Sequence, residues 1–216
     1  AMENNITWQL TGPRGDYFVA GTTGLIGGWG FNYPHQAAYD VFVAAGDTVR
    51  KPASILSLAD LRAMGGDWTN ESSWGWDGCI RVKYGTRMDE TSGENGAVPE
   101  LNYGTNLRLI RYGDVLLMAA EANHMAGNDA AAGTYLNQVR QRAKLGPYSG
   151  DIMQAIKTER QLELVFEGVR FLDLVRWGDA PTVLGPFGFV AGKHEVFPIP
   201  QDEMRNNSQA TQNNGY

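Results

Sequence analysis

The sequence is poor in the residues that build several common kinds of site. Its single cysteine, Cys79, excludes an internal disulfide, a paired-cysteine redox motif and a cysteine-rich zinc site within these 216 residues. Its three histidines, His35, His124 and His194, are scattered without metal-ligand spacing. We therefore expect no metal and no cofactor.

Positive charge and long apolar runs are also scarce. The chain has 18 Lys+Arg against 24 Asp+Glu, a net charge of -6. This balance argues against nucleic acid as a main partner, because phosphate binding depends on clustered cations. No apolar run approaches the roughly 18 residues of a membrane-spanning helix. With 43% hydrophobic residues the chain is still apolar enough to fold around a substantial core.

The two halves of the chain differ in composition. Residues 1–105 hold 16 of the 27 glycines and five of the six tryptophans, with 12 acidic against 7 basic residues. Residues 106–216 hold 12 acidic and 11 basic residues. We predict a loop-rich aromatic lobe over residues 1–105, containing short strands, and a helical scaffold over residues 106–216. The ligand-binding region is expected in the first of these.

Helical periodicity is strong only in the second half. The predicted helices span residues 106–126, 129–145, 152–167 and 169–177. Asp129 and Asp151 are the expected N-caps of the second and third helices. In the first half a short helix is predicted at 35–45 and a strand at 80–84. The fold class is therefore mostly α, with helical hairpins like those of tetratricopeptide repeats packed with the loop-rich lobe.

Charged residues concentrate after residue 158. Glu159, Glu163 and Glu167 recur every four residues, so they lie along one helix face and need cations between them. The cations near enough in sequence are Arg160, Arg170 and Arg176. We interpret this set as a structural ion network. The alternative is a glycoside hydrolase that uses Glu163 with Glu167 or Asp173, but such pairs flank a sugar across a cleft rather than stacking along a helix.

Aromatic and polar residues are mixed in two stretches of the first half. Trp68, Trp74 and Trp76 lie within nine residues, and Trp29 is close to Asn32 and Tyr33. Sugar rings stack on aromatic rings while their hydroxyls bond polar groups, much as nucleic acid bases stack on such rings. The alternative is that the tryptophans fill a loop-rich core. The predicted ligand-binding residues are Trp29, Asn32, Tyr33, Trp74, Trp76, Asp77 and Arg81.

The second half resembles the SusD/RagB family in five segments that occur in the family's order. They are LRLIRYGDVLLMAAEA at 107–122, LNQVRQRA at 136–143, the run from Ile156 to Trp177 with its ER, EL, FEGVR, DL and RW pairs, FPIP at 197–200 and QNNGY at 212–216. Asn214 stands where the family usually has proline. The resemblance implies that the charged motifs belong to the scaffold and that ligand specificity lies in the variable loops.

The resemblance also implies a function. Members are non-catalytic outer-membrane lipoproteins that capture glycans, or sometimes peptides, on the outer face of the cell. The members then pass these ligands to a SusC-like TonB-dependent transporter. Members usually run to about twice this length, so the resemblance implies that this chain is the C-terminal portion, without the lipid anchor. A different class of function stays open, namely a peptide- or protein-binding helical-repeat module whose groove is lined by the hairpin helices.

Overall fold

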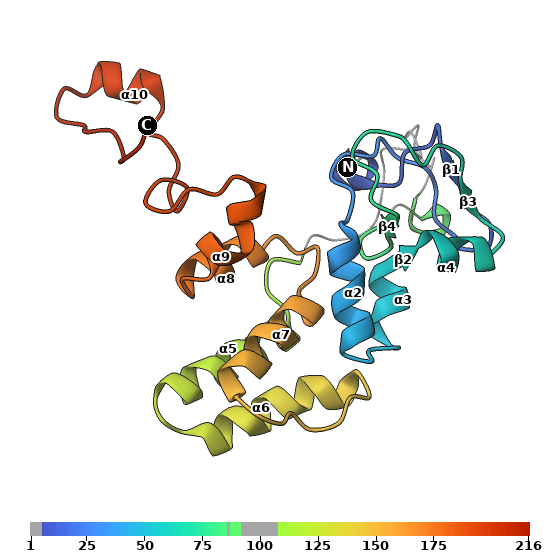
Figure 1. Ribbon diagram of the computed structural model, residues 1–216, viewed down its shortest axis with the longest axis horizontal. Helices are drawn as coiled ribbons and strands as arrows, with labels where there is room; N and C mark the ends of the chain where they lie inside the picture. Colours follow the sequence, from blue (N-terminus) through green and yellow to red (C-terminus); the bar gives the residue numbers. More distant parts are fainter. Residues whose placement is uncertain (1–5, 86, 92–107) are drawn as a thin grey trace. The chain divides into compact units, whose positions relative to one another are not determined.

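The computed structural model describes residues 6–85, 87–91 and 108–216. The chain is mostly helical with a few short strands, as the sequence predicts (Figure 1). It divides into two compact units, Ala1–Phe166 and Glu167–Tyr216. The boundary predicted at residue 105 lies outside the described residues. Within the described ranges, no helix combines the length and the hydropathy that a membrane span requires.

The first part of unit 1 is built from short elements and loops. Its helices are α1 (Ile6–Thr11), α2 (Gln36–Ala44), α3 (Arg50–Ser54) and α4 (Leu58–Ala63), followed by the 3-10 helix η1 (Met88–Glu90). Its strands form two antiparallel pairs, β1 (Phe18–Val19) with β3 (Asp67–Trp68) and β2 (Ile55–Ser57) with β4 (Cys79–Arg81). The strand predicted at 80–84 corresponds to the shorter β4, which ends at Arg81, and its partner is β2.

Polar side chains fix where these short helices begin. Ser57 Oγ accepts a hydrogen bond from the Asp60 amide at 3.1 Å, and Asp60 Oδ2 accepts one from the Ser57 amide at 3.0 Å, so the pair forms a capping box for α4. At α2, the amide of Gln36 donates to Asp77 Oδ2 at 2.8 Å. Asp77 thus ties α2 to the segment before β4.

Two hydrophobic clusters hold this part together. The larger one contains Leu25, Leu56, Leu61, Trp68, Ile80 and Val82. The other contains Phe42, Ile55, Cys79 and Leu162. Because Leu162 comes from a helix of the second half of the sequence, the loop-rich part and the helical part of unit 1 share one core.

The helical part of unit 1 consists of three helices. They are α5 (Tyr112–Met125), α6 (Asp129–Arg142) and α7 (Ile152–Glu163). The three-residue connection from Ala126 makes α5 and α6 a helical hairpin, and α7 packs on both (Figure 1). Their cluster contains Leu116, Leu117, Ala120, Ala132, Leu136, Val139, Ile152 and Ile156. The predicted hairpin is therefore present.

The ends of these helices differ from prediction, and the second helix ends at Arg142 rather than at 145. The first begins at Tyr112 rather than 106, residues 106 and 107 lying outside the described ranges. The second is capped by Asn128, whose side chain accepts from the Ala131 amide, so the prediction of Asp129 as its cap was wrong. The third is capped by Asp151, as predicted, but ends at Glu163 because Phe166 adopts a left-handed φ of 62°.

Unit 2 has short helices and an extended tail. Its helices are α8 (Arg170–Arg176), α9 (Ala180–Leu184) and α10 (Gln201–Asn206), with the 3-10 helix η4 (Gly185–Phe187) after α9. The Gln212 side chain accepts from the Ile199 amide at 2.8 Å and donates to the Ile199 carbonyl at 2.9 Å. Tyr216 Oη donates to the Val196 carbonyl at 3.0 Å. The FPIP and QNNGY segments of the sequence therefore bond to each other.

Candidate functional site

Two predicted ligand-binding tryptophans stand at the surface of the loop-rich part. Trp29 is 50% exposed and Trp74 is 89% exposed. Phe31, two residues after Trp29, is also exposed. Their exposure leaves the faces of these rings open to stack on a ligand.

The backbone around Trp29 is fixed although its ring is exposed. The Trp29 amide donates to the Gln9 carbonyl at 2.8 Å, and the Phe31 amide donates to the Leu10 carbonyl at 2.9 Å. Between them Gly30 has a φ of 71°, and a Cβ there would lie 2.3 Å from Tyr33 Oη. Only glycine fits at position 30 without displacing Tyr33. The rings of Trp29 and Phe31 are therefore carried by a backbone segment that these hydrogen bonds hold in place.

A pocket of about 300 Å³ lies beside Trp29. Its walls come from Arg14, Gly15 and Asp16 on one side and Gly28, Trp29 and Phe31 on the other. Arg14 Nε donates to Asp16 Oδ2 at 2.8 Å. The pocket thus combines aromatic rings with a guanidinium and a carboxylate, which is the mixture that stacks on and hydrogen-bonds to a sugar. Asn32, also exposed, has a left-handed φ of 66° next to this pocket.

Two other predicted residues pack inside the loop-rich part. The rings of Trp76 and Trp68 are stacked with centroids 4.1 Å apart and an interplanar angle of 3°. Tyr33 meets both rings edge-on, at 5.5 Å from Trp68 and 6.1 Å from Trp76. Both Tyr33 and Trp76 are half-buried. One face of Trp76 is therefore occupied by Trp68, and a ligand role for these two residues stays a prediction.

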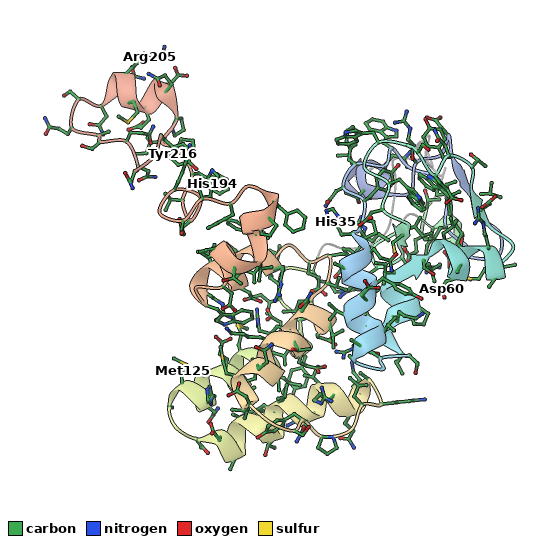
Figure 2. All side chains as sticks on the ribbon, in the orientation of Figure 1. His35, Asp60, Met125, His194, Arg205 and Tyr216 are labelled. Carbon is green, nitrogen blue, oxygen red and sulfur yellow. The ribbon has the colours of Figure 1, made fainter. Side chains whose placement is uncertain are left out.

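The polar residues predicted to bond sugar hydroxyls lie in different surroundings. Asp77 is exposed and bonds the start of α2, where its Oδ2 is also 3.2 Å from His35 Nδ1; Figure 2 labels His35 there. Arg81 is only 7% exposed and donates to Thr11 Oγ1 and the Tyr84 carbonyl. Burial lowers the pKa of Arg81 to about 10. This burial weighs against contact between Arg81 and a surface ligand.

Sequence reasoning missed Arg14, Asp16 and Phe31. Phe31 lies two residues from Trp29, so it belongs to the same stretch of mixed aromatic and polar residues. Arg14 and Asp16 carry no such signal, because their place beside Trp29 depends on backbone hydrogen bonds between residues 13–15 and Gly28.

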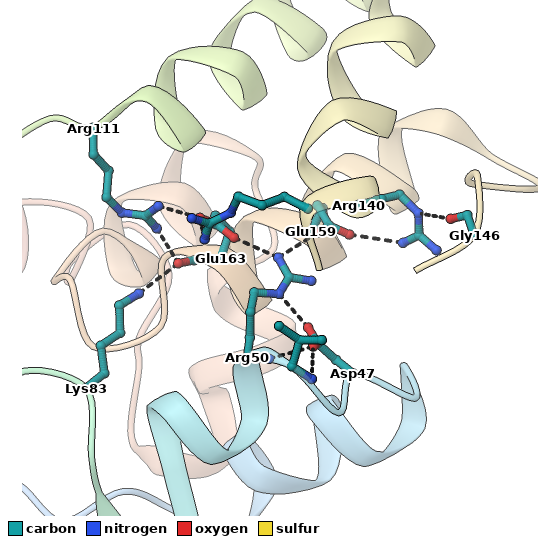
Figure 3. Close-up of polar contacts among 10 residues, drawn as sticks. Asp47, Arg50, Lys83, Arg111, Arg140, Gly146, Glu159 and Glu163 are labelled. Carbon is teal, nitrogen blue, oxygen red and sulfur yellow. Dashed lines mark hydrogen bonds and ion pairs between the residues drawn. The ribbon is translucent and has the colours of Figure 1, made fainter. Parts of the chain in front are cut away.

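The charged residues of α7 form a buried cluster inside unit 1 (Figure 3). Arg50 Nη1 lies 2.7 Å from Glu159 Oε1 and 2.8 Å from Glu163 Oε2. Arg140 pairs with Glu159 at 3.0 Å, and Arg111 and Arg142 pair with Glu163. Arg50 also pairs with Asp47, which is buried.

The predicted ion network is therefore present around Glu159 and Glu163, and the arginines that pair with these two are ones that sequence reasoning did not name. The pairing arginines are Arg50, Arg111, Arg140 and Arg142. Arg160 follows Glu159 directly, so it points about 100° away around the helix, and it pairs with Asp114 instead. Arg170 and Arg176 belong to unit 2, where Arg176 pairs with Asp173.

The electrostatics of Glu163 do not suit a catalytic acid. Burial alone would raise the pKa of Glu163, but hydrogen bonds from Arg111 and Arg50 outweigh burial and hold this pKa below its ordinary value. A glycosidase acid needs the opposite shift, because it must carry a proton near neutral pH. The other predicted partners, Glu167 and Asp173, lie in unit 2.

The described residues show neither a reactive cysteine nor a cluster of metal ligands. Cys79 is buried, and burial raises its pKa to about 12, so the thiol stays protonated. Among the described residues, no group of three or more His, Cys, Asp or Glu side chains is placed to hold a metal ion.

Comparison with known proteins identifies the scaffold. The SusD family model matches residues 91–188. The chain is 34% identical over 145 residues to "SusD-like protein P2" of Formosa agariphila, covering 58% of this chain and 28% of that protein. It is 30% identical over 99 residues to a "SusD-like protein" of Bacteroides ovatus, covering 44% of this chain and 18% of that protein.

The solved structures agree with these matches. A "Laminarin binding SusD-like protein" superimposes with a TM-score of 0.82 at 35% identity, over 100% of this chain and 45% of that one. "Surface glycan-binding protein A from Bacteroides thetaiotaomicron" gives 0.78 at 28% identity, over 97% and 46%. The chain belongs to the SusD/RagB family.

The SusD/RagB signature can now be read in structural terms. Its ER and EL pairs contain Glu159 and Glu163, and its LNxVRxRA segment contains Arg140 and Arg142. Arg140 pairs with Glu159 and Arg142 pairs with Glu163, so the two segments meet within the buried cluster. The laminarin-binding SusD-like protein matches this chain over its whole length. This chain nevertheless spans less than half the length of the relatives described above.

Proposed function

We propose that this SusD/RagB chain binds oligosaccharides without catalysis at the outer face of the outer membrane, as part of a lipid-anchored protein. It delivers them to a SusC-like TonB-dependent transporter. The names of the relatives support glycan binding, since one is a laminarin-binding protein and another a surface glycan-binding protein. The observation that carries the proposal is the pair of exposed tryptophans, with Trp29 beside its pocket.

The physical basis is stacking. A pyranose ring has an apolar C–H face that packs on an indole, while its hydroxyls bond side chains at the rim. Trp29 offers the ring, and Arg14 and Asp16 offer a donor and an acceptor within the same pocket. Trp74 stands almost fully exposed in the same loop-rich part of unit 1 and offers a second ring. Such a surface can hold a chain of sugars without cleaving it.

A second candidate function is peptide or protein binding by the helical hairpin. The observation that favours it is a row of exposed apolar side chains on α5. They are Tyr112, Val115, Met118 and Met125; Figure 2 labels Met125 at the end of that helix. Binding of this kind would survive the loss of Trp29 and Trp74, whereas glycan binding would not.

Titration calorimetry with a laminari-oligosaccharide tests the glycan proposal. We expect Trp29→Ala and Trp74→Ala each to weaken binding by about 1–3 kcal/mol, the range measured for bases stacked on aromatic rings. Phe197→Ala is the matched control, because this exposed aromatic ring lies in unit 2. If both tryptophan variants bind every oligosaccharide that the unchanged protein binds, with equal affinity, the site assignment fails.

A further inference from the structure

A second, larger cavity in unit 1 has a different character. It encloses about 590 Å³, which lies within the usual range for small-ligand sites. Its walls come from the end of α3, the turn after β4, η1, the approach to α5, and α6 and α7. Six of its lining residues are cations, namely Arg50, Lys83, Arg87, Arg108, Arg111 and Arg142. We call this cavity the arginine pocket.

The positive charges of the arginine pocket exceed its negative charges. Among the residues that the structure describes, two carboxylates, Glu90 and Glu163, line it against the six cations. Glu163 already pairs with Arg50, Arg111 and Arg142, and Arg50 is further shared with Glu159. Among the described lining residues the positive charges therefore outnumber the negative ones by four, on a chain whose net charge is -6. Asp47 and Glu159, which lie behind the lining, balance Arg50.

Two of these cations are available to a ligand. Arg108 is exposed and has no ion-pair partner among the residues that the structure describes. Arg142 has 72% of its side chain exposed and meets Glu163 through one nitrogen at 3.2 Å. Both also line the adjoining cavity beside Gly113 and Gln138, so they stand at the shared border of the two cavities. A guanidinium offers five donors in a planar fork that matches carboxylate and sulfate groups.

An aromatic residue lies in the same wall. Tyr84 lines the arginine pocket with a left-handed φ of 54°, a conformation that costs energy for a tyrosine. Its carbonyl accepts a hydrogen bond from Arg81 Nη2 at 3.3 Å, which helps to hold that conformation. Cations alone suit any small anion, whereas cations with an aromatic ring suit a ring-shaped ligand that carries a negative charge.

We propose that the arginine pocket binds an acidic sugar residue, with Arg108 and Arg142 on its negative group and Tyr84 beside its ring. The negative group is a carboxylate or a sulfate ester. The inference rests on the proposed function only in taking the ligand to be a glycan, and it adds a second subsite that selects for charge. Neutral oligosaccharides bind at Trp29 and Trp74, and acidic ones engage the arginine pocket.

The test compares one neutral and two acidic probes by titration calorimetry. The probes are a laminari-tetrasaccharide, a tetragalacturonate, and a sulfated galactose tetrasaccharide. We expect Arg108→Gln with Arg142→Gln to weaken binding of at least one acidic probe by about 10-fold to 100-fold, the range for one or two charged hydrogen bonds. Affinity for the neutral probe stays unchanged. The carboxylate and the sulfate probe, compared with each other, show which group the pocket takes.

Two further variants separate this role from general charge effects. Arg205→Gln removes an exposed arginine of unit 2 that pairs with Asp202, and it should leave all affinities unchanged. Arg108→Lys keeps the charge without the planar fork and should retain part of the affinity. The proposal is overturned if neither acidic probe binds, or if the double variant binds them as tightly as the unchanged chain. If the neutral probe still depends on Trp29 and Trp74, the proposed function survives that failure.

Discussion

At the scale of single residues, Glu163 has the largest structural role in the buried cluster. Its carboxylate pairs with arginines from α3, from α6 and from the residue before α5. Its backbone carbonyl accepts from Lys83 Nζ at 2.8 Å. The side chain is 1% exposed, so water cannot replace any lost partner. Glu163 therefore joins α7 to four other segments of the chain, three through its carboxylate and one through its backbone carbonyl.

Glu163→Gln should destabilise unit 1 strongly. The amide keeps the shape but leaves three guanidinium groups without their shared anion, and breaking a buried pair costs about 3–5 kcal/mol. Urea unfolding followed by tryptophan fluorescence measures the loss. The matched control is Glu71→Gln, which removes an exposed carboxylate paired with Arg62 at 2.8 Å and should change stability little. Equal stability of the two variants would contradict the bracing role of Glu163.

The same residue makes stability depend on pH. Its folded-state pKa lies below the value in the unfolded chain, so its contribution is present above the unfolded pKa and is lost as pH falls through the folded pKa. The free energy of unfolding should therefore fall as the pH is lowered from about 5 to about 2. The difference between the unchanged chain and Glu163→Gln should shrink over the same range. A constant difference, measured by urea unfolding at each pH, would show that Glu163 does not titrate in this way.

At the scale of elements, the start of α5 is fitted to the buried cluster. Gly113 lies in the first turn of that helix, against the Glu163 carboxylate. An added Cβ would lie 2.8 Å from Glu163 Oε1 and 2.9 Å from Arg111 Nη1. These are side-chain ends, but the arginines hold the carboxylate in place. The absence of a side chain at position 113 is thus what lets the carboxylate approach the helix start, where negative charge is favoured.

Gly113→Ala should destabilise the protein by about 1–3 kcal/mol, the usual cost of overpacking. Alanine normally favours a helix over glycine, so the sign of the effect reports the contact with Glu163. Gly146→Ala is the control, because no heavy atom lies within 4 Å of the Cβ it would add. Thermal unfolding followed by circular dichroism gives both values, and a stabilising Gly113→Ala would show that the carboxylate moves aside freely.

Sequence patterns predicted the helices better than their ends and partners. The helices near 112–125, 129–142, 152–163 and 170–176 follow from apolar periodicity, which depends only on neighbouring residues. The end of α7 depends on a left-handed Phe166, a conformation that no residue preference signals. The cations of the charged cluster could not be found from spacing, because Arg50 lies 113 residues from Glu163.

Sequence patterns likewise predicted only part of the candidate site. Aromatic density among polar residues identified Trp29 and Trp74, which are exposed. The same pattern also selected Trp76 and Tyr33, whose rings pack with Trp68. Composition cannot separate these cases, because a loop-rich core and a sugar platform both draw on large aromatic side chains. Burial decides between them, and burial is set by contacts far apart in sequence.

At the scale of the whole molecule, the two units differ in how much core they hold. Unit 1 contains three hydrophobic clusters as well as the charged cluster. The fully buried side chains described in unit 2 are few, namely Asp173, Leu174 and Ala180. Many of its apolar side chains, such as Phe187 and Phe197, are exposed instead. A segment this short with so little buried apolar surface is marginal as an independent fold.

Residues 1–166 should therefore unfold cooperatively when produced alone, and residues 167–216 should not. Circular dichroism during heating measures both fragments, with the full chain as the reference. The first fragment should show one sharp transition, because its clusters lie wholly inside it. The second should lose its helical signal gradually. A sharp transition in the second fragment alone would mean that its short helices are self-sufficient.

The link from Asp47 and Arg50 to α7 has a consequence for engineering. Its ion pairs join the loop-rich part of unit 1 to α7, and none of these residues belongs to the stretches around Trp29 or Trp74. Foreign peptide segments could thus be grafted at those two stretches without disturbing the anchorage. A library randomised there, with Asp47, Arg50, Glu159 and Glu163 held constant, would supply new surfaces on an unchanged framework, to be screened for affinity toward chosen molecules.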